Sequence, residues 1–206
     1  MKILKEGHSF IGTPLIVGLV LIGVGGNEIS IIIGILFILV SLFCIYFFRD
    51  PKVQITDGDN LILSPCNGMV LEVSETEKDK IVRVFLSVLD VHLQRSPVAG
   101  RVVSVEYKPG KFLKAMKPQA HIVNEQNIII IENKSGKYFV KQVAGILARR
   151  CVSWVKSGDV LKRGDKIGMI KFSSQVDLHM PKTVNIRVKQ GDKVVAGVTI
   201  FATLNY

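Results

Sequence analysis

The first 48 residues of this 206-residue chain are almost without charge. Their only acidic and basic side chains cancel: Lys2, Lys5, Glu6 and Glu28. In place of charge there are two apolar runs, Phe10 to Val24 and Ile29 to Phe48, with the turn sequence Gly-Gly-Asn-Glu between them. The second run is about as long as a helix that crosses a bilayer. A small-residue cleavage site is also missing. That argues against a signal peptide and favours an α-helical membrane hairpin over residues 1–48.

Basic residues flank both ends of this expected hairpin. Lys2 and Lys5 precede the first run, and Arg49 and Lys52 follow the second. Because lysine and arginine favour the inner side of a membrane, we expect both ends to lie on the cytoplasmic face of the cell membrane. The first run is short and contains Pro14, so a re-entrant hairpin that does not cross the bilayer is the alternative.

Cysteine is scarce, and its three positions are scattered: Cys44, Cys66 and Cys151. Their spacing fits neither a disulfide framework nor a zinc site, so we expect no metal and a reducing compartment. The net charge of +10 belongs to residues 49–206, yet that part has no helix-turn-helix, RNP motif or lysine-rich tail. We therefore expect no nucleic acid partner. Anionic lipid head groups fit the charge better, with a solvated basic face as the alternative.

Residues 49–206 form one domain that we predict to be all-β. Short alternating or continuous apolar segments follow one another from Leu61 to a last strand over Val194–Phe201, with Gly-containing turns between them. This spacing predicts a sandwich or barrel-like sheet. Helix is scarce, with a turn or two expected over Ala144–Cys151. The turns at Gly158 and Gly164 are similar to the hammerhead of biotinyl and lipoyl domains, but no carrier lysine sits in a tight hairpin.

Ser173 and Ser174 lie between two of these strand-like segments. The apolar run before them ends at Phe172, and an alternating run begins at Val176. Both flanks predict strands, which would hold the Ser-Ser peptide rigidly. Taken alone, two serines are more often polar residues at a bend.

Seven segments in order give the pair a context. They are Phe47-Phe48-Arg49-Asp50-Pro51, Leu63-Ser64-Pro65-Cys66-Asn67-Gly68, Phe85 to His92, Arg95-Ser96-Pro97-Val98, Gly110 to Ala115 with Asn124-Glu125, Ala144 to Arg150, and the Ser-Ser stretch itself. Together they resemble the short, membrane-anchored class of phosphatidylserine decarboxylase proenzymes, which includes the archaetidylserine decarboxylases. The similarity covers essentially the whole chain.

The resemblance implies that the chain cuts itself. The Ser174 hydroxyl would attack the carbonyl of Ser173, and β-elimination would then release a chain of residues 1–173. The new chain, residues 174–206, would begin with a pyruvoyl group derived from Ser174. A strained turn must present the hydroxyl to the carbonyl, and the two products would stay together as a heterodimer.

The resemblance also implies the reaction. The pyruvoyl cofactor would form a Schiff base with the serine head group of a phospholipid and act as an electron sink for decarboxylation to the ethanolamine lipid. His92 is the candidate acid, with Asp90 as a possible helper. A structural role for His92 is the alternative, and His121 and His179 stay undecided.

Three positions depart from the family pattern. Ser173 stands where most members have glycine, Asn67 replaces an aspartate, and Arg95 replaces a histidine. In longer members the last two positions belong to a Ser-His-Asp arrangement for self-cleavage. An amide cannot stabilise an imidazolium as a carboxylate does. We therefore expect His92, assisted by Asp90, to act instead.

The substrate phosphate has three candidate partners: Arg149, Arg150 and Lys111. A guanidinium fork suits phosphate oxygens, but ion pairs across the sheet explain these residues equally well. Diacyl and isoprenoid-ether lipids both stay open, and family members generally pair further as dimers. Two other functions are alternatives. One is a catalytically silent, membrane-tethered β-domain that binds lipid or partner proteins. The other is a biotinyl-like accessory module.

Overall fold

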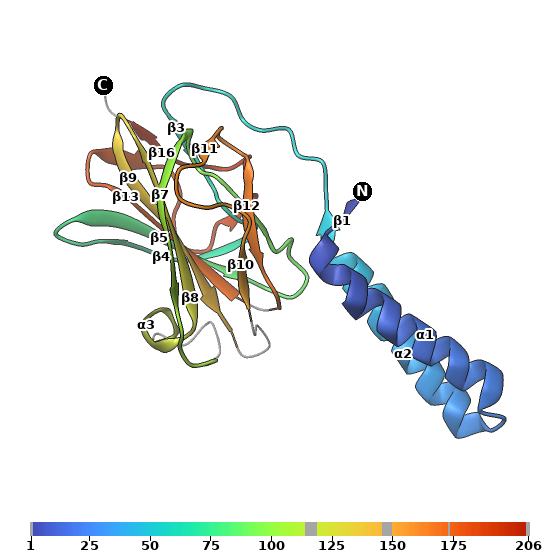
Figure 1. The fold of residues 1–206 in the computed structure, drawn as a ribbon. Helices are drawn as coiled ribbons and strands as arrows, with labels where there is room; N and C mark the ends of the chain where they lie inside the picture. The colour runs from blue at the N-terminus through green and yellow to red at the C-terminus, as the bar shows by residue number, and fades with distance from the viewer. Residues whose placement is uncertain (1, 114–118, 146–149, 173, 205–206) are drawn as a thin grey trace. The chain divides into compact units, whose positions relative to one another are not determined.

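A computed structural model describes residues 2–113, 119–145, 150–172 and 174–204 (Figure 1). It divides the chain into two compact units, Met1–Lys52 and Val53–Tyr206. Each unit is described by itself below.

The first unit is a pair of antiparallel helices, α1 (His8–Val24) and α2 (Glu28–Phe47). The Asn27 side chain accepts a hydrogen bond from Ser30 N at 2.9 Å and so caps the start of α2. Gly18 of α1 and Gly34 of α2 let the two backbones touch, because a Cβ added to either would lie 2.7 Å from the other's carbonyl oxygen. Both helices have the length and apolar composition to cross a membrane. The predicted helices of the N-terminal segment are confirmed.

Short elements join the two ends of the helix pair. β1 (Lys2–Ile3) pairs with β2 (Arg49–Asp50), and the 3-10 helix η1 (Lys5–Gly7) leads into α1. Nearer the middle, Ser41 Oγ donates to the carbonyl of Ile11 at 2.8 Å. The hydroxyl therefore meets its hydrogen-bonding need inside the helix pair, as an apolar surrounding requires.

The described part of the second unit consists of strands and one short helix. In chain order these are β3 (Leu61–Leu63), β4 (Gly68–Glu75), β5 (Asp79–Leu86), β6 (Leu93–Arg95), β7 (Gly100–Lys108), α3 (Ala120–Val123), β8 (Gln126–Asn133), β9 (Gly136–Ala144), β10 (Cys151–Ser153), β11 (Val160–Leu161), β12 (Lys166–Ile170), β13 (Ser174–Pro181), β14 (Val184–Ile186), β15 (Lys193–Val194) and β16 (Ile200–Leu204). The mostly β prediction is confirmed, and the second unit is called the β-domain below.

The β-domain is organised around a curled eight-stranded antiparallel sheet in the order β11-β7-β8-β9-β13-β5-β4-β15 (Figure 1). Two three-stranded sheets, β10-β12-β6 and β14-β16-β3, complete it. β13 alternates along its length: Val176, Leu178 and Met180 belong to the buried core, whereas Gln175 and Asp177 point to the other face. The core thus lies on one face of β13 and its neighbours.

Two sequence predictions are wrong. The single strand expected over Val194–Phe201 is interrupted, because Thr199 N donates to the Val195 carbonyl and Gly197 takes a φ of +74°. Apolar alternation does not reveal such a turn. The short helix expected over Ala144–Cys151 is also wrong at its ends, since Ala144 closes β9 and Cys151 opens β10. Residues 146–149 lie outside the described residues. The only short helix among the described residues of the β-domain is α3.

Three turns share one construction. In each, an aspartate carboxylate accepts from the amide of the lysine three positions earlier, which closes the turn around a glycine: Lys156–Asp159, Lys162–Asp165 and Lys189–Asp192. These are the turns that the sequence predicts. The likeness to biotinyl domains stays a prediction.

Candidate active site

Ser174 begins β13 in the interior of the large sheet. It pairs with Leu86 at the end of β5 and with Ala144 at the end of β9. Its side chain is fully buried, and its Oγ has no hydrogen-bond partner among the described residues. Nearly all buried hydroxyls in proteins are bonded, so an orphan such as this one is unusual and points to a chemical role. Ser173, the other half of the predicted cleavage site, lies outside the described residues.

On the β9 side of Ser174, side-chain and main-chain hydrogen bonds link the neighbouring segments to one another. Ala144 N donates to the Glu125 carbonyl at 2.9 Å. The Glu125 carboxylate in turn accepts from Cys151 N at 3.2 Å, and Cys151 pairs with Ile170 of β12. Burial, and then Glu125, raise the pKa of the Cys151 thiol, so this cysteine stays protonated. These bonds and strand pairings connect Ser174 to Ile170 through Ala144, Glu125 and Cys151.

The β5 side completes these connections. Ile170 N donates to the His92 carbonyl at 3.3 Å, and the loop of residues 87–91 connects His92 to Leu86, the partner of Ser174. These pairings and bonds join Ser174, Ala144, Glu125, Cys151, Ile170, His92 and Leu86 into a ring. His92 is therefore linked to the segment before Ser174 through Ile170, and to the strand partner of Ser174 through the loop of residues 87–91.

The chain between Ile170 and Ser174 is strained at Phe172. Phe172 has a φ of +60°, and it is the only non-glycine residue of the described part of the chain with positive φ. For a bulky side chain this conformation is a true outlier that costs about 1–3 kcal/mol. The strain lies two residues before Ser174, where self-cleavage would require a forced turn.

His92 is buried, and its ring is held from one side. Its Nδ1 lies 2.9 Å from the main-chain carbonyl of Asp90. A carbonyl only accepts hydrogen bonds, so Nδ1 carries the hydrogen and Nε2 holds the lone pair in the neutral ring. The Asp90 carboxylate instead accepts from Ser87 N at 2.8 Å. The structure thus brings His92 and Asp90 together through the main chain of Asp90, and the carboxylate shapes the loop.

A buried chain of amides fixes the main chain at His92. Gln94 Nε2 donates to the His92 carbonyl at 2.7 Å, Gln142 Nε2 donates to Gln94 Oε1 at 2.8 Å, and Asn127 Nδ2 donates to Gln142 Oε1 at 2.7 Å. All three amide side chains are almost completely buried. A fully bonded polar chain of this kind holds one geometry, because each member left unpaired in the core would be costly.

Asn124 makes a second anchor beside Ser174. Its Nδ2 donates to the carbonyls of Leu113 and Ala144 at 2.8 and 2.7 Å, and its Oδ1 accepts from Leu113 N at 2.9 Å. The side chain is 2% exposed. One buried amide therefore connects the residue that pairs with Ser174 to the segment around Lys111, which forms a parallel bridge with Asn124.

Two of the three positions that depart from the family pattern, Asn67 and Arg95, lie among the described residues and bond to main-chain atoms. Asn67 Oδ1 accepts from Ala196 N at 3.2 Å, and Arg95 Nη1 donates to the Gly164 carbonyl at 2.9 Å. Both bonds go to main-chain atoms that stabilise the fold. They fit the expectation that neither Asn67 nor Arg95 takes part in a Ser-His-Asp arrangement.

The candidate phosphate partners lie at the Ser174 end of the β-domain. Lys111 is exposed and bonded through its main chain to Val123 and Glu125. Arg150 is exposed, and its carbonyl accepts from Lys171 N at 3.2 Å, next to the strained segment. Arg149 lies outside the described residues.

A buried charge cluster occupies the outer face of β13. Asp177 is fully buried, lies 3.5 Å from Arg83 Nε, and pairs across the strands with Arg83 and Lys141. Burial lowers the pKa of Lys141, while Asp177 opposes this change.

Burial, and then Asp90 and Asp177, raise the pKa of the Cys66 thiol well above its ordinary value. This thiol is inert at neutral pH.

The other two histidines are placed differently. His121 lies in α3, where its carbonyl accepts from Lys141 Nζ and Gln126 Nε2. His179 lies five residues beyond Ser174 on β13, about 17 Å along the strand. Its Nδ1 is 3.4 Å from Asp79 Oδ2. His179 is therefore remote from Ser174.

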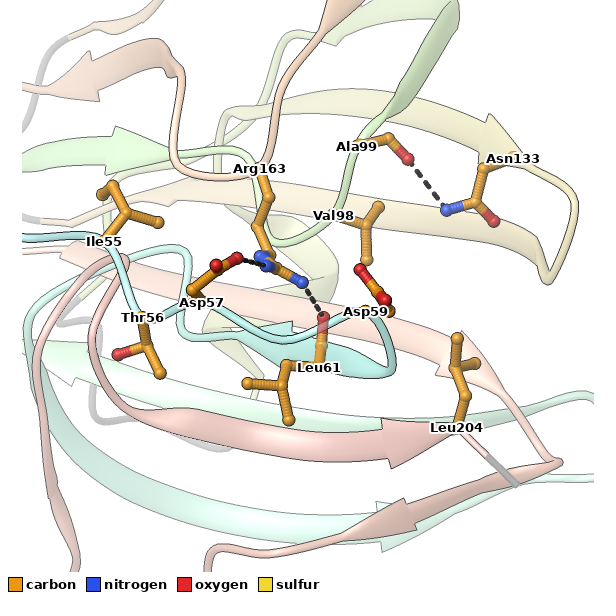
Figure 2. A pocket seen from close by; sticks show the side chains of 10 residues that line it. All are labelled: Ile55, Thr56, Asp57, Asp59, Leu61, Val98, Ala99, Asn133, Arg163 and Leu204. Atoms are coloured by element: carbon orange, nitrogen blue, oxygen red, sulfur yellow. Dashed lines mark hydrogen bonds and ion pairs between the residues drawn. The ribbon is translucent and has the colours of Figure 1, made fainter. Parts of the chain in front are cut away.

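A cavity of about 580 Å³ lies at the opposite end of the β-domain (Figure 2). Arg163 crosses it and bonds to Asp57 Oδ1 at 3.3 Å and to the carbonyls of Gly58 and Leu61. Asn133, on another wall, donates to the Ala99 carbonyl at 2.8 Å. Asn133 pairs with Gly136, eight residues along β9 from Ala144, which is about 26 Å. The Arg163 guanidinium holds a loop together, and this cavity is separate from Ser174.

Sequence reasoning did not assign roles to the buried amides and Glu125. A usable signal exists for Gln142, because it interrupts the inward apolar positions Tyr138, Val140 and Ala144. A polar residue at a core position needs a partner. Asn124-Glu125 is part of the motif pattern, but no spacing rule gives its contacts.

Comparisons with known proteins give matches to one family. A family profile described as phosphatidylserine decarboxylase matches residues 40–202. The chain is 40% identical to the phosphatidylserine decarboxylase proenzyme of Carboxydothermus hydrogenoformans, an alignment that covers 97% of this chain and 95% of that protein. It is also 40% identical to the proenzyme of the same name from Geotalea uraniireducens, covering 98% and 96%. The proenzyme of Ehrlichia chaffeensis is 37% identical, covering 97% and 90%.

Proposed function

Because the chain belongs to the phosphatidylserine decarboxylase family, we propose that it removes carbon dioxide from the serine head group of a phospholipid and makes the ethanolamine lipid. Phosphatidylserine is the substrate named for the relatives, and archaetidylserine shares the same head group. The observation that best supports the proposal is the buried Ser174 hydroxyl, which has no hydrogen-bond partner among the described residues and follows two residues after the strained Phe172.

The chain matures by cutting itself before Ser174. The Ser174 Oγ attacks the Ser173 carbonyl carbon, the C–N bond breaks, and an ester forms. Loss of the Ser174 α-proton then expels the Ser173 carboxylate. The dehydroalanine that is left takes up water and releases ammonia, which leaves a pyruvoyl group at the start of residues 174–206. The Phe172 strain lowers the cost of the turn that this attack needs.

The residues around Ser174 fit a pyruvoyl group. The serine is buried at the end of an interior strand, so a keto group there would be shielded from water by the ring. When present, the pyruvoyl group supplies the electron sink for loss of the carboxylate. His92 offers Nε2 as the atom that takes up and passes on a proton, because the hydrogen on Nδ1 is held by the Asp90 carbonyl. Arg150 and Lys111 offer cations to the phosphate, with Arg149 beside Arg150 in sequence.

The helix pair anchors the enzyme in the membrane that contains its substrate. Basic residues at both ends of the pair favour the cytoplasmic side for the β-domain. The two chains made by cleavage remain associated, and further dimerisation is consistent with the family.

The test is the mass of the purified full-length protein and its activity on phosphatidylserine. We expect two fragments that meet at Ser173 and Ser174, the smaller one blocked at its amino end. Ser174→Ala removes the hydroxyl and should abolish both cleavage and carbon dioxide release. Ser173→Ala should still cleave, at least slowly. An intact, hydroxylamine-insensitive chain would refute the proposal and leave a silent lipid-binding homologue. Cleavage lost only in Ser173→Ala would show that the other serine is converted. Supplying diacyl and isoprenoid-ether lipids in parallel identifies the tails.

A further inference from the structure

The large exposed apolar side chains of the β-domain are gathered in one place. Among its described residues, four Leu, Ile, Phe or Tyr side chains are exposed: Leu89 by 60%, Tyr107 by 60%, Phe112 by 40% and Ile122 by 67%. The remaining exposed apolar side chains there are valines and one methionine, and they are scattered: Met69, Val73, Val103, Val160, Val195 and Val198. Single exposed valines are ordinary, but clustered large side chains call for a partner.

All four large side chains lie at the end of the sheet that carries Ser174. The antiparallel order brings β5, β7, β8, β9 and β13 to this end at Leu86, Lys108, Gln126, Ala144 and Ser174. Leu89 is in the connection after β5, whereas Phe112 and Ile122 are in the connection between β7 and β8. Tyr107 is the penultimate residue of β7. Figure 1 shows α3, which carries Ile122, beside this end of β8.

The same end presents positive charge. Lys108, Lys111 and Arg150 are exposed there. The two acids in the described parts of these connections are engaged: Asp90 accepts from Ser87 N, and Glu125 accepts from Cys151 N. Glu106 on β7 is an exposed acid nearby. The opposite end differs, because exposed acids and bases are mixed there: Asp57, Asp59, Glu77, Lys78, Lys134 and Lys182.

We propose that Leu89, Tyr107, Phe112 and Ile122, together with Lys108, Lys111 and Arg150, form a second membrane contact that seats the Ser174 end of the β-domain on an anionic bilayer. We call this surface the bilayer-contact end. The proposal rests on the proposed function for its purpose, but not for its geometry. Apolar tips that enter the acyl region beside cations that stay with the head groups are the usual composition of a membrane-surface site.

The bilayer suits this surface better than a protein partner. The apolar side chains come from the end of β7, from the connection after β7 and from the connection after β5, and exposed lysine and arginine lie among them. They therefore do not form the continuous apolar core of a subunit interface. If the tails of the substrate remain in the bilayer, its head group must be the part that approaches Ser174. The contact would let the serine head group enter the site while the tails stay in lipid.

The first experiment places single tryptophans in the full-length protein. Trp154 is the only tryptophan, so Trp154→Phe gives a silent background. Leu89→Trp and Ile122→Trp report the bilayer-contact end, and Val160→Trp, at a residue 70% exposed at the opposite end, is the matched control. The protein is placed in nanodiscs of phosphatidylcholine and phosphatidylglycerol whose acyl chains carry bromine near the head groups. We expect strong quenching at positions 89 and 122 and almost none at 160. Equal quenching at all three, or none at 89 and 122, would overturn the proposal. Absent quenching with a doubled particle mass would assign the surface to a second copy.

The second experiment separates docking from chemistry. Leu89→Ser and Ile122→Ser should each raise KM for phosphatidylserine in nanodiscs about fivefold to tenfold, as loss of a buried side chain predicts. Their kcat, and their rate on a short-chain, water-soluble phosphatidylserine, should not change, and Val160→Ser should match the wild type. An equal loss on both substrates would contradict docking. If no substrate is decarboxylated by any variant, the proposed function fails, and the quenching pattern still decides this proposal.

Discussion

At the Ser174 end of the β-domain, Asn124, Gln142 and Glu125 are buried. Asn124 and Glu125 are hydrogen-bonded to main chain, and Gln142 is bonded to the side chains of Gln94 and Asn127. At the opposite end, Arg163 and Asp57 form an ion pair in which the carboxylate is fully exposed. The same sheet supports both ends. A surface ion pair adds little energy and tolerates change, whereas a buried amide holds one position strictly. The difference indicates which end needs accurate geometry.

The largest expected contrast is between two histidines on opposite sides of this comparison. His92→Gln keeps a hydrogen-bonding side chain but removes the titrating nitrogen, so decarboxylation should fall about 10²–10⁴-fold. His179→Gln, remote from Ser174, should change the rate less than about twofold. Carbon dioxide release by equal amounts of cleaved protein measures both. An equal loss in the two variants would remove His92 from the chemistry.

Two asparagines test whether burial matters more than the number of hydrogen bonds. Asn124 and Asn133 each make three, but Asn124 is buried and Asn133 is only partly so. Asn124→Ala strands buried groups and should cost about 1–3 kcal/mol, with cleavage slowed at least about tenfold. Asn133→Ala should cost about 1 kcal/mol or less and leave cleavage unchanged. Urea unfolding and the time course of cleavage after cell-free synthesis give the two readouts. Similar costs in both variants would contradict the comparison.

Backbone strain gives a smaller, reciprocal effect. Phe172→Gly relaxes a positive φ two residues before Ser174, so the precursor should gain about 1 kcal/mol while cleavage slows several-fold. Gly158→Ala introduces strain at φ +95°, where a Cβ meets nothing within 4 Å. It should lose about 1 kcal/mol without slowing cleavage. Faster cleavage in Phe172→Gly would show that the strain does not assist the reaction.

The smallest effect concerns pH. Burial lowers the pKa of His179, against the opposing charges of Asp177 and Asp79 and with Lys141 adding to the lowering. The unfolded chain therefore binds the proton more readily, and stability should fall as pH drops below the unfolded value of about 6.5. His179→Gln should lessen the fall in melting temperature between pH 7 and pH 5 by a few degrees. The same slope in both proteins would exclude His179 as its source.

Much of the strand pattern follows from the sequence because β-strands leave a period of two. The apolar alternation predicts strands over Leu61–Leu63, Arg101–Tyr107, Asn127–Glu132 and Tyr138–Val143. The observed β3 has the predicted bounds, and β7, β8 and β9 agree to within two residues at each end. The turn at Gly197 escapes, because it depends on a local bond between Thr199 and Val195 within an apolar run. Alternation reports which face a side chain takes and says nothing of such bonds.

The candidate site could be predicted from the sequence only in part. Ser174, His92 and the departures at Asn67 and Arg95 come from motif similarity, and the structure gives each a place. The ring that joins Glu125, Cys151 and Ile170 comes from strands far apart in sequence. No local pattern encodes such pairings, since they depend on the complete sheet.

The position of β13 has a consequence for the life of the enzyme. A chain cut before Ser174 keeps that strand bonded to β5 along Ser174–Pro181 and to β9 along residues 174–179, and β16 stays bonded to β3. The small fragment is then interwoven with the large one, and release would require the sheet to melt. Cleavage there would thus remove a covalent link without loosening the sheet. Once melted, the cut protein must find its partner again by collision, so its refolding should depend on concentration, whereas that of the uncut Ser174→Ala chain should not.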